Sequence, residues 1–151
     1  MDGQLSIEER RLLLALARQS LADAVHGRPV QEIRLAELPE RLKQDGASFV
    51  TLTRQGELRG CIGALEAYQS LVEDVREHAV AAGLEDYRFP QVRPAELDQI
   101  QIEISRLTSP VELHYSSPED LLAQLRPGID GVTLRDGRQR ATFLPQVWQK
   151  I

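Results

Sequence analysis

The chain lacks most features of secreted, membrane-spanning and metal-stapled proteins. Its 151 residues include a single cysteine, Cys61, so no internal disulfide can form. No apolar run approaches the roughly 18 residues of a membrane span, and no signal-peptide pattern follows Met1. HExxH, CxxC and carboxylate clusters with ligand spacing are missing, so we expect no metal site and no cofactor. We therefore expect a soluble protein of the cytoplasm with no membrane partner.

The chain also lacks an excess of positive charge. It carries 18 basic and 23 acidic residues, a net charge of −5, which argues against nucleic acid as a partner. Asparagine is absent, and every basic residue except Lys43 and Lys150 is arginine. This bias fits either recognition of anions by arginine or a GC-rich coding bias. Apolar and charged fractions of 42% and 27% are typical of one globular domain, with or without a small subdomain.

Capping residues at three places along the chain predict helices. Ser6 and Glu9 form a capping box that predicts a helix ending at Gly27, and Ser70 and Glu73 predict another to about Gly83. Ser117 followed by proline predicts a third helix, to about Leu125. Shorter helical segments are expected over 39–44, 94–97 and 145–151, the last as a helix cut short.

The strand signals come as two hairpins and one alternating segment. Residues 47–65 predict a hairpin with its turn over 54–57, and Asp136-Gly137 marks the turn of a second hairpin. Alternation over 99–107 places Ile100, Ile102 and Ile104 on one face of a half-buried strand. Without regular βαβ alternation, the pattern predicts an α+β fold with antiparallel sheets flanked by helices.

The segment Leu58-Arg59-Gly60-Cys61-Ile62-Gly63 stands out. On a strand, Arg59, Cys61 and Gly63 share one face, and an arginine so close lowers a thiol pKa and makes Cys61 a candidate catalytic nucleophile. The alternative is that Cys61 is a small buried hydrophobic residue, the commonest role of a free thiol. Two glycines in one strand indicate a bulge or a close approach of another group to the backbone.

A base for the thiol would have to be one of three histidines. His26 ends the first helix and His114 lies near the end of an extended segment. His78 falls on the apolar face of the second helix, where a satisfied core histidine is commoner than a catalytic base. The sequence therefore leaves a thiol enzyme without an assigned base.

Three blocks in order carry a resemblance to a known family. FVTLTRQGELRGCIGALEA, GLEDYRFPQVRPAELDQIQIEIS and LRPGIDGVTLRDGRQRATFLPQVW resemble the AMMECR domain family, whose bacterial and archaeal members are protein A of the AmmeMemoRadiSam system. The resemblance covers about residues 5–151, and the whole chain, 1–151, is expected to be one AMMECR domain. It implies an α+β fold with a larger and a smaller subdomain, and no established enzymatic activity.

The resemblance also implies a functional surface at the LRGCIG segment. Family signature residues fall on three further groups of positions: Arg88, Phe89 and Pro90; Glu103 and Ser105; and Arg126, Pro127, Gly128, Asp130, Gly131, Thr142, Phe143, Leu144, Pro145 and Trp148. The chain departs from the family pattern at Leu84 and Tyr87, where phenylalanine and proline are usual. Relatives continue past the tryptophan by about one helix, so the family's C-terminal helix is expected to be missing here.

Two functions follow as hypotheses. The first is an accessory module that binds a small ligand or a partner, the expected partners being the Memo-like protein and the radical SAM enzyme of the same system. In it, Arg59, Arg88 and Glu103 form a polar pocket, and Gly60 and Gly63 let a ligand approach the backbone. Phe89 and Ser105 are expected as further binding residues. The second is an enzyme that uses Cys61 as a nucleophile or redox thiol activated by Arg59.

Overall fold

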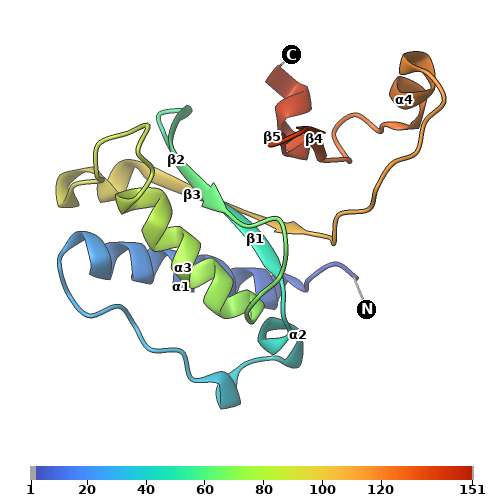
Figure 1. Ribbon diagram of the computed structural model, residues 1–151. Coiled ribbons are helices and arrows are strands. Elements are labelled where there is room, and N and C mark those ends of the chain that lie inside the picture. The colour runs from blue at the N-terminus through green and yellow to red at the C-terminus, as the bar shows by residue number, and fades with distance from the viewer. Residues whose placement is uncertain (1–2, 151) are drawn as a thin grey trace. The chain divides into compact units, whose positions relative to one another are not determined.

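The computed structural model describes residues 3–150 of the chain (Figure 1). They fall into two compact units, a larger one over residues 3–110 and a smaller one over 111–150. Both contain helices and antiparallel strands, so the α+β fold class expected from the sequence is confirmed. No helix of the described chain is long and apolar enough to cross a membrane.

The first helix begins and ends where its sequence signals predict. In α1 (Ile7–Val25) the Ser6 hydroxyl accepts the Glu9 N–H, while the Glu9 carboxylate accepts the Ser6 N–H at 2.7 Å. Both bonds satisfy amide groups that the first turn leaves without partners. Gly27, at φ +71°, ends the helix in the left-handed region. The connection that follows holds η1 (Leu35–Glu37) and α2 (Glu40–Lys43).

The larger unit is built on a three-stranded antiparallel sheet in the order β2-β1-β3. Strand β1 (Ala47–Arg54) turns directly into β2 (Glu57–Gly63), with Gln55 and Gly56 both at positive φ, as the primed hairpin turns require. Helix α3 (Leu71–Leu84) and the 3-10 helix η2 (Pro94–Gln99) lead to β3 (Ile100–Leu107), which pairs with the other edge of β1.

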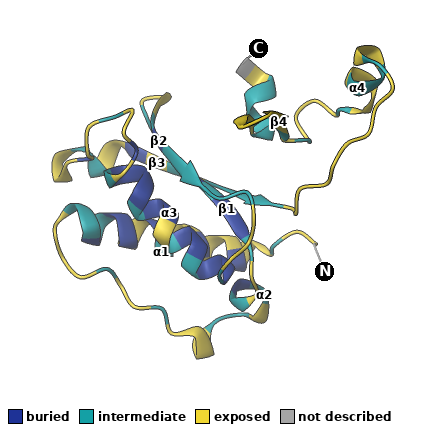
Figure 2. Ribbon diagram, viewed as in Figure 1, coloured by how far each residue is buried: buried dark blue, intermediate teal, exposed yellow. Residues whose placement is uncertain are grey.

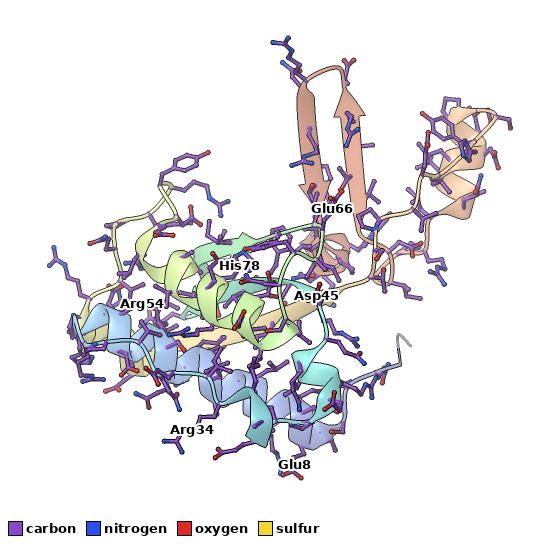
Figure 3. The ribbon with its side chains drawn as sticks, turned by 60° about the horizontal axis from the view of Figure 1, so that its bottom comes forward. Glu8, Arg34, Asp45, Arg54, Glu66 and His78 are labelled. Atoms are coloured by element: carbon purple, nitrogen blue, oxygen red, sulfur yellow. The ribbon has the colours of Figure 1, made fainter. Side chains whose placement is uncertain are left out.

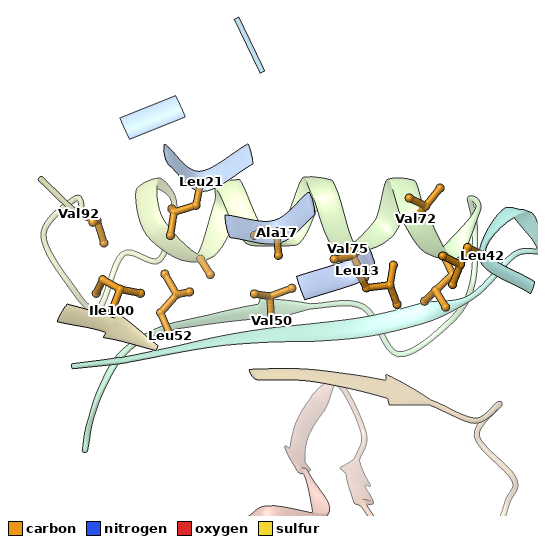
Figure 4. Packing of buried hydrophobic residues seen from close by; sticks show 13 residues of the cluster. Leu13, Ala17, Leu21, Leu42, Val50, Leu52, Val72, Val75, Val92 and Ile100 are labelled. Carbon is orange, nitrogen blue, oxygen red and sulfur yellow. The ribbon is translucent and has the colours of Figure 1, made fainter. Parts of the chain in front are cut away.

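Helices α1 and α3 lie side by side on one face of this sheet, here called the inner face (Figures 1 and 2). The alternation of β1 and β3 places Val50 and Leu52 on that face together with the three isoleucines of β3, as the sequence predicts for the isoleucines. The resulting core, shown in Figure 4, consists of Leu13, Ala17, Leu21, Leu42, Val50, Leu52, Leu71, Val72, Val75, Ala79, Ala82, Val92 and Ile100.

The smaller unit contains α4 (Pro118–Gln124), the hairpin of β4 (Val132–Asp136) and β5 (Gln139–Phe143), and the 3-10 helix η3 (Pro145–Lys150). The hairpin turn lies at Gly137 and Arg138, one residue later than Asp136-Gly137, because Asp136 still pairs with Gln139. The expected terminal helix is a 3-10 helix, and Ile151 lies outside the described residues. Within the unit, the Trp148 indole N–H donates to the Asp130 carbonyl at 2.8 Å.

Candidate functional site

The LRGCIG segment forms β2, and its residues project from both faces of the sheet. Register places Thr51 of β1 between Cys61 of β2 and Glu103 of β3, so these three side chains form a row across the outer face, opposite the helices. The Thr51 hydroxyl and the Cys61 thiol lie at hydrogen-bonding distance, 3.2 Å. The sheet thus brings two of the predicted site residues, Cys61 and Glu103, onto one surface.

A second row lies beside the first. Phe49 of β1 stands between Gly63 and Ser105, which are its paired residues on β2 and β3. Because residues two apart on a strand share a face, Ser105 and Gly63 lie on the same outer face as Cys61 and Glu103. Glu103 is exposed and Ser105 half-buried, and both take part in further polar interactions.

Arg59 does not share this face with the thiol in the way the sequence predicts. The register of β1 with β2 shifts between Leu52 and Thr53, so Arg59 is the extra residue of a β-bulge. Its guanidinium binds Glu96 through Nε at 2.9 Å and Nη2 at 3.1 Å, and Nη1 donates to the Pro90 carbonyl at 2.8 Å. Arg59 therefore ties β2 to η2 and the segment before it.

Arg88 is the cation near Cys61. Its Nε and Nη2 bind the two carboxylate oxygens of Asp86 at 2.9 and 2.7 Å, and its Nη2 lies 3.4 Å from the Cys61 carbonyl. The buried Asp86 also accepts the backbone N–H of Cys61 at 2.9 Å, at the unpaired edge of β2. The Arg88 guanidinium lies 5.4 Å from the centre of the half-buried Phe89 ring.

The thiol is not activated in this environment. Burial raises the pKa of Cys61, and the opposing effects of the Thr51 hydrogen bond and the Arg88 charge do not cancel it. The prediction that Arg59 lowers the thiol pKa is therefore wrong, because Arg59 is occupied by Glu96. Cys61 itself remains a half-buried free thiol whose catalytic role stays a prediction.

Gly60 and Gly63 have a packing role that differs from the predicted one. A Cβ atom on Gly60 would lie 2.0 Å from the Ala82 carbonyl oxygen of α3. A Cβ atom on Gly63 would lie 2.4 Å from both the Phe49 ring and the Ser48 carbonyl oxygen. The two glycines do mark close approaches, as expected, but the chain's own α3 and β1 occupy the space rather than a ligand.

His78 lies on α3 (Figure 3), and its ring joins a polar network between α3 and β1. The fully buried Asp74 carboxylate lies 3.1 Å from His78 Nδ1 and accepts bonds from the Ser48 N–H at 2.8 Å and the Ser48 hydroxyl at 2.6 Å. Burial alone would raise the pKa of Asp74, but the bonds from His78 and Ser48 outweigh it and hold the pKa below its usual value. His78 is thus a hydrogen-bonded core histidine.

One group of side chains in the described chain has metal-ligand spacing. Ligand atoms of Asp74, Glu77 and His78 lie within 4.8 Å of one another. Asp74 Oδ2 already accepts three hydrogen bonds, and Glu77 Oε2 is contacted by Tyr68 and by Gln69. Hydrogen bonds from protein donors explain why these ligand atoms lie close together, so we interpret the group as a structural hydrogen-bond network.

We expect the two ion pairs at β2, Asp86 with Arg88 and Glu96 with Arg59, to make the stability of the protein sensitive to acid. Arg88 holds the pKa of Asp86 at about 2, and Arg59 holds that of Glu96 at about 2, against usual values of 3.8 and 4.5. Carboxyl groups with depressed pKa stabilise the fold above their unfolded values and lose this contribution as pH falls toward 2. Thermal melts from pH 6 to pH 2 should show the melting temperature falling mainly below about pH 4.5.

The variants Asp86→Asn and Glu96→Gln should each reduce the fall of the melting temperature at acid pH, here called the acid limb, because neither amide titrates. Asp98→Asn, at an exposed aspartate of η2, is the matched control and should leave the limb unchanged. A limb of wild-type steepness in the double variant Asp86→Asn/Glu96→Gln would show that other carboxyl groups are responsible.

Sequence reasoning missed Thr51, Asp86 and Glu96, which complete the site. Asp86 bonds Cys61 from 25 positions away, and Glu96 bonds Arg59 from 37. The one available signal for Asp86 was local: its carboxylate accepts the Arg88 N–H two residues on, the pattern of an Asx turn. Thr51 could have been placed beside Cys61 only by fixing the hairpin register.

Comparison with known proteins gives the family. The AMMECR1 family model matches residues 14–151. A protein of Methanothermobacter thermautotrophicus is 41% identical over 144 residues, covering 95% of this chain and 74% of the relative. A protein of Thermofilum pendens is 37% identical over 156 residues, covering 96% and 72%. The chain thus spans about three quarters of these relatives.

A solved structure has the same fold as this chain. The crystal structure of the uncharacterized protein PH0010 from Pyrococcus horikoshii matches with a TM-score of 0.86 at 32% identity. The match covers 95% of this chain and 72% of that one. On the family model, these relatives and the shared fold, the chain belongs to the AMMECR1 family.

Proposed function

We propose that this AMMECR1-family chain is a binding module whose site is the outer sheet face around Cys61. The supporting observation is that the arginine within the LRGCIG strand and the arginine at its edge are already held by carboxylates, Arg59 by Glu96 and Arg88 by Asp86. Side chains fixed in this way lose little conformational entropy on binding, which favours recognition of a ligand.

The chemistry of the face suggests what it recognises. Arg88 lies at the β2 edge and Glu103 on β3, so a cation and a carboxylate stand at opposite ends of the row through Thr51. Two strand spacings separate the Cα atoms of Cys61 and Glu103 by roughly 10 Å. Such a face suits a polar small ligand, or a polar segment of a partner, with groups of both charges, and Ser105 and Phe89 extend it.

The partners proposed from the family resemblance are the Memo-like protein and the radical SAM enzyme of the same system, acting in the cytoplasm. Nucleic acid remains an unexpected partner at a net charge of −5. Co-elution of the purified chain with each of these two proteins, followed by calorimetry, tests whether they bind. We expect Arg88→Gln and Glu103→Gln each to weaken the complex by roughly tenfold, as lost charged contacts do.

Gln101→Ala is the matched control for Glu103→Gln. Gln101 is also exposed on β3 and shares the outer face, but it lies outside the two rows, so its loss should leave the affinity unchanged. Equal weakening by all three variants, or full affinity in both charge variants, would contradict the proposed location of the site.

We expect the thiol titration to separate this proposal from a thiol enzyme. Alkylation of the folded protein across pH 5–11 should be half-maximal above the usual thiol pKa of about 8.5, because burial raises the pKa of Cys61. Arg88→Gln should move the midpoint further up, since Arg88 favours the thiolate. Arg59→Gln should leave it in place, since Arg59 is paired with Glu96. Cys61 is the sole thiol, so adduct mass has one source.

A midpoint at or below about pH 7 that rises in Arg59→Gln would instead restore the activated nucleophile. No specific contact of the described residues favours that alternative, since Cys61 meets Thr51 and not a histidine.

A further inference from the structure

A groove of about 520 Å³ lies in the larger unit between the N-terminal part of α1 and the edge strand β3. Its volume falls within the roughly 300–1,000 Å³ of small-ligand sites. Aliphatic side chains from both elements line it, including Leu13 and Leu14 of α1 and Ile102 and Ile104 of β3. Leu14 is 40% exposed, so the groove presents apolar surface to solvent.

Two arginines stand in the lining, Arg10 of α1 and Arg106 of β3. Arg10 Nη2 lies 3.5 Å from the Gln4 side-chain oxygen, and Arg106 Nη1 donates to the Gly3 carbonyl at 2.9 Å. These two acceptors are neutral oxygens. Glu103 also lines the groove and takes part in interactions of its own.

We propose that this groove binds an amphipathic anion, a carboxylate carrying a linear apolar chain of roughly ten carbons. The apolar chain would lie along the aliphatic lining, and the carboxylate would pair with Arg10 and Arg106. A guanidinium whose hydrogen bonds go to neutral oxygens gains most from a carboxylate, because the charge-assisted bond is about twice as strong. The proposal does not rest on the function proposed for the outer sheet face, although Glu103 borders both places.

Titration calorimetry with decanoate, below its micelle concentration, tests the proposal. We expect saturable binding at one site, with decanol weaker by roughly tenfold or more because it lacks the charge. Octanoate should bind weaker by roughly tenfold, because it buries two fewer methylene groups. Equal affinity for decanoate and decanol, or no saturable binding at millimolar decanoate, would overturn the proposal.

Two pairs of variants locate the site on the protein. Arg10→Gln should weaken decanoate by roughly tenfold, while Arg11→Gln, at the adjacent exposed arginine outside the groove, should not. Leu14→Glu should abolish binding by placing a like charge in the lining, while Leu12→Glu should not. Leu12 is 38% exposed on the same helix and does not line the groove, so both variants add equal charge at similar exposure. Wild-type affinity in Arg10→Gln and Leu14→Glu would refute the site.

Discussion

Gly60→Ala is expected to destabilise the larger unit by about 3 kcal/mol, within the upper range for overpacking. The added Cβ would lie 2.0 Å from the Ala82 carbonyl oxygen, which belongs to the backbone of α3 and cannot rotate away as a side chain can. Either β2 or α3 must move, and each is anchored elsewhere. Urea unfolding followed by far-UV circular dichroism measures the effect, because α1 and α3 supply most of the helix in the described chain.

Gly56→Ala, in the turn of the same hairpin, is the matched control. Gly56 has φ +81° and open space around it, so alanine there is strained by the backbone alone, at about 1 kcal/mol. The close approach therefore predicts that Gly60→Ala is the more harmful change, although Gly60 lacks positive φ. If Gly56→Ala destabilised the protein more than Gly60→Ala, α3 would be able to move away from β2 at little cost in free energy.

Asp74→Ala is expected to cost about 3 kcal/mol, the upper end of the range for leaving buried hydrogen-bonding groups without their partner. The change removes a fully buried carboxylate and leaves the N–H and hydroxyl of Ser48, also fully buried, without their acceptor. Ser48 lies at the start of β1, the central strand, so the loss also affects how β1 is held against α3.

Urea unfolding again measures this loss, with Asp98→Ala as the control at an exposed aspartate. Asp74→Asn keeps the volume and one acceptor oxygen, and should cost less than Asp74→Ala. If the free energies of unfolding of Asp74→Asn and Asp74→Ala both lay within about 0.5 kcal/mol of the wild-type value, the network would contribute little to folding.

Much of the candidate site was predictable from local patterns, but its contacts were not. The LRGCIG strand, the alternation that puts Glu103 and Ser105 on one face, and the link to Arg88 all follow from spacing or from the family resemblance. The cation near the thiol was misassigned, because the two glycines indicated a bulge or a close approach without placing a bulge at Arg59. Arg88, from a loop after α3, takes that place instead.

The sequence by itself determined the elements, since capping boxes, strand alternation and turn residues act over only a few positions. Only the tertiary structure decided which side chains meet. Arg59 and Glu96 stand 37 positions apart, and Asp86 reaches Cys61 across 25. The ionisation of a group depends on the charges, donors and burial around it in space. The pKa of Cys61 is therefore set by its packing, and burial raises it.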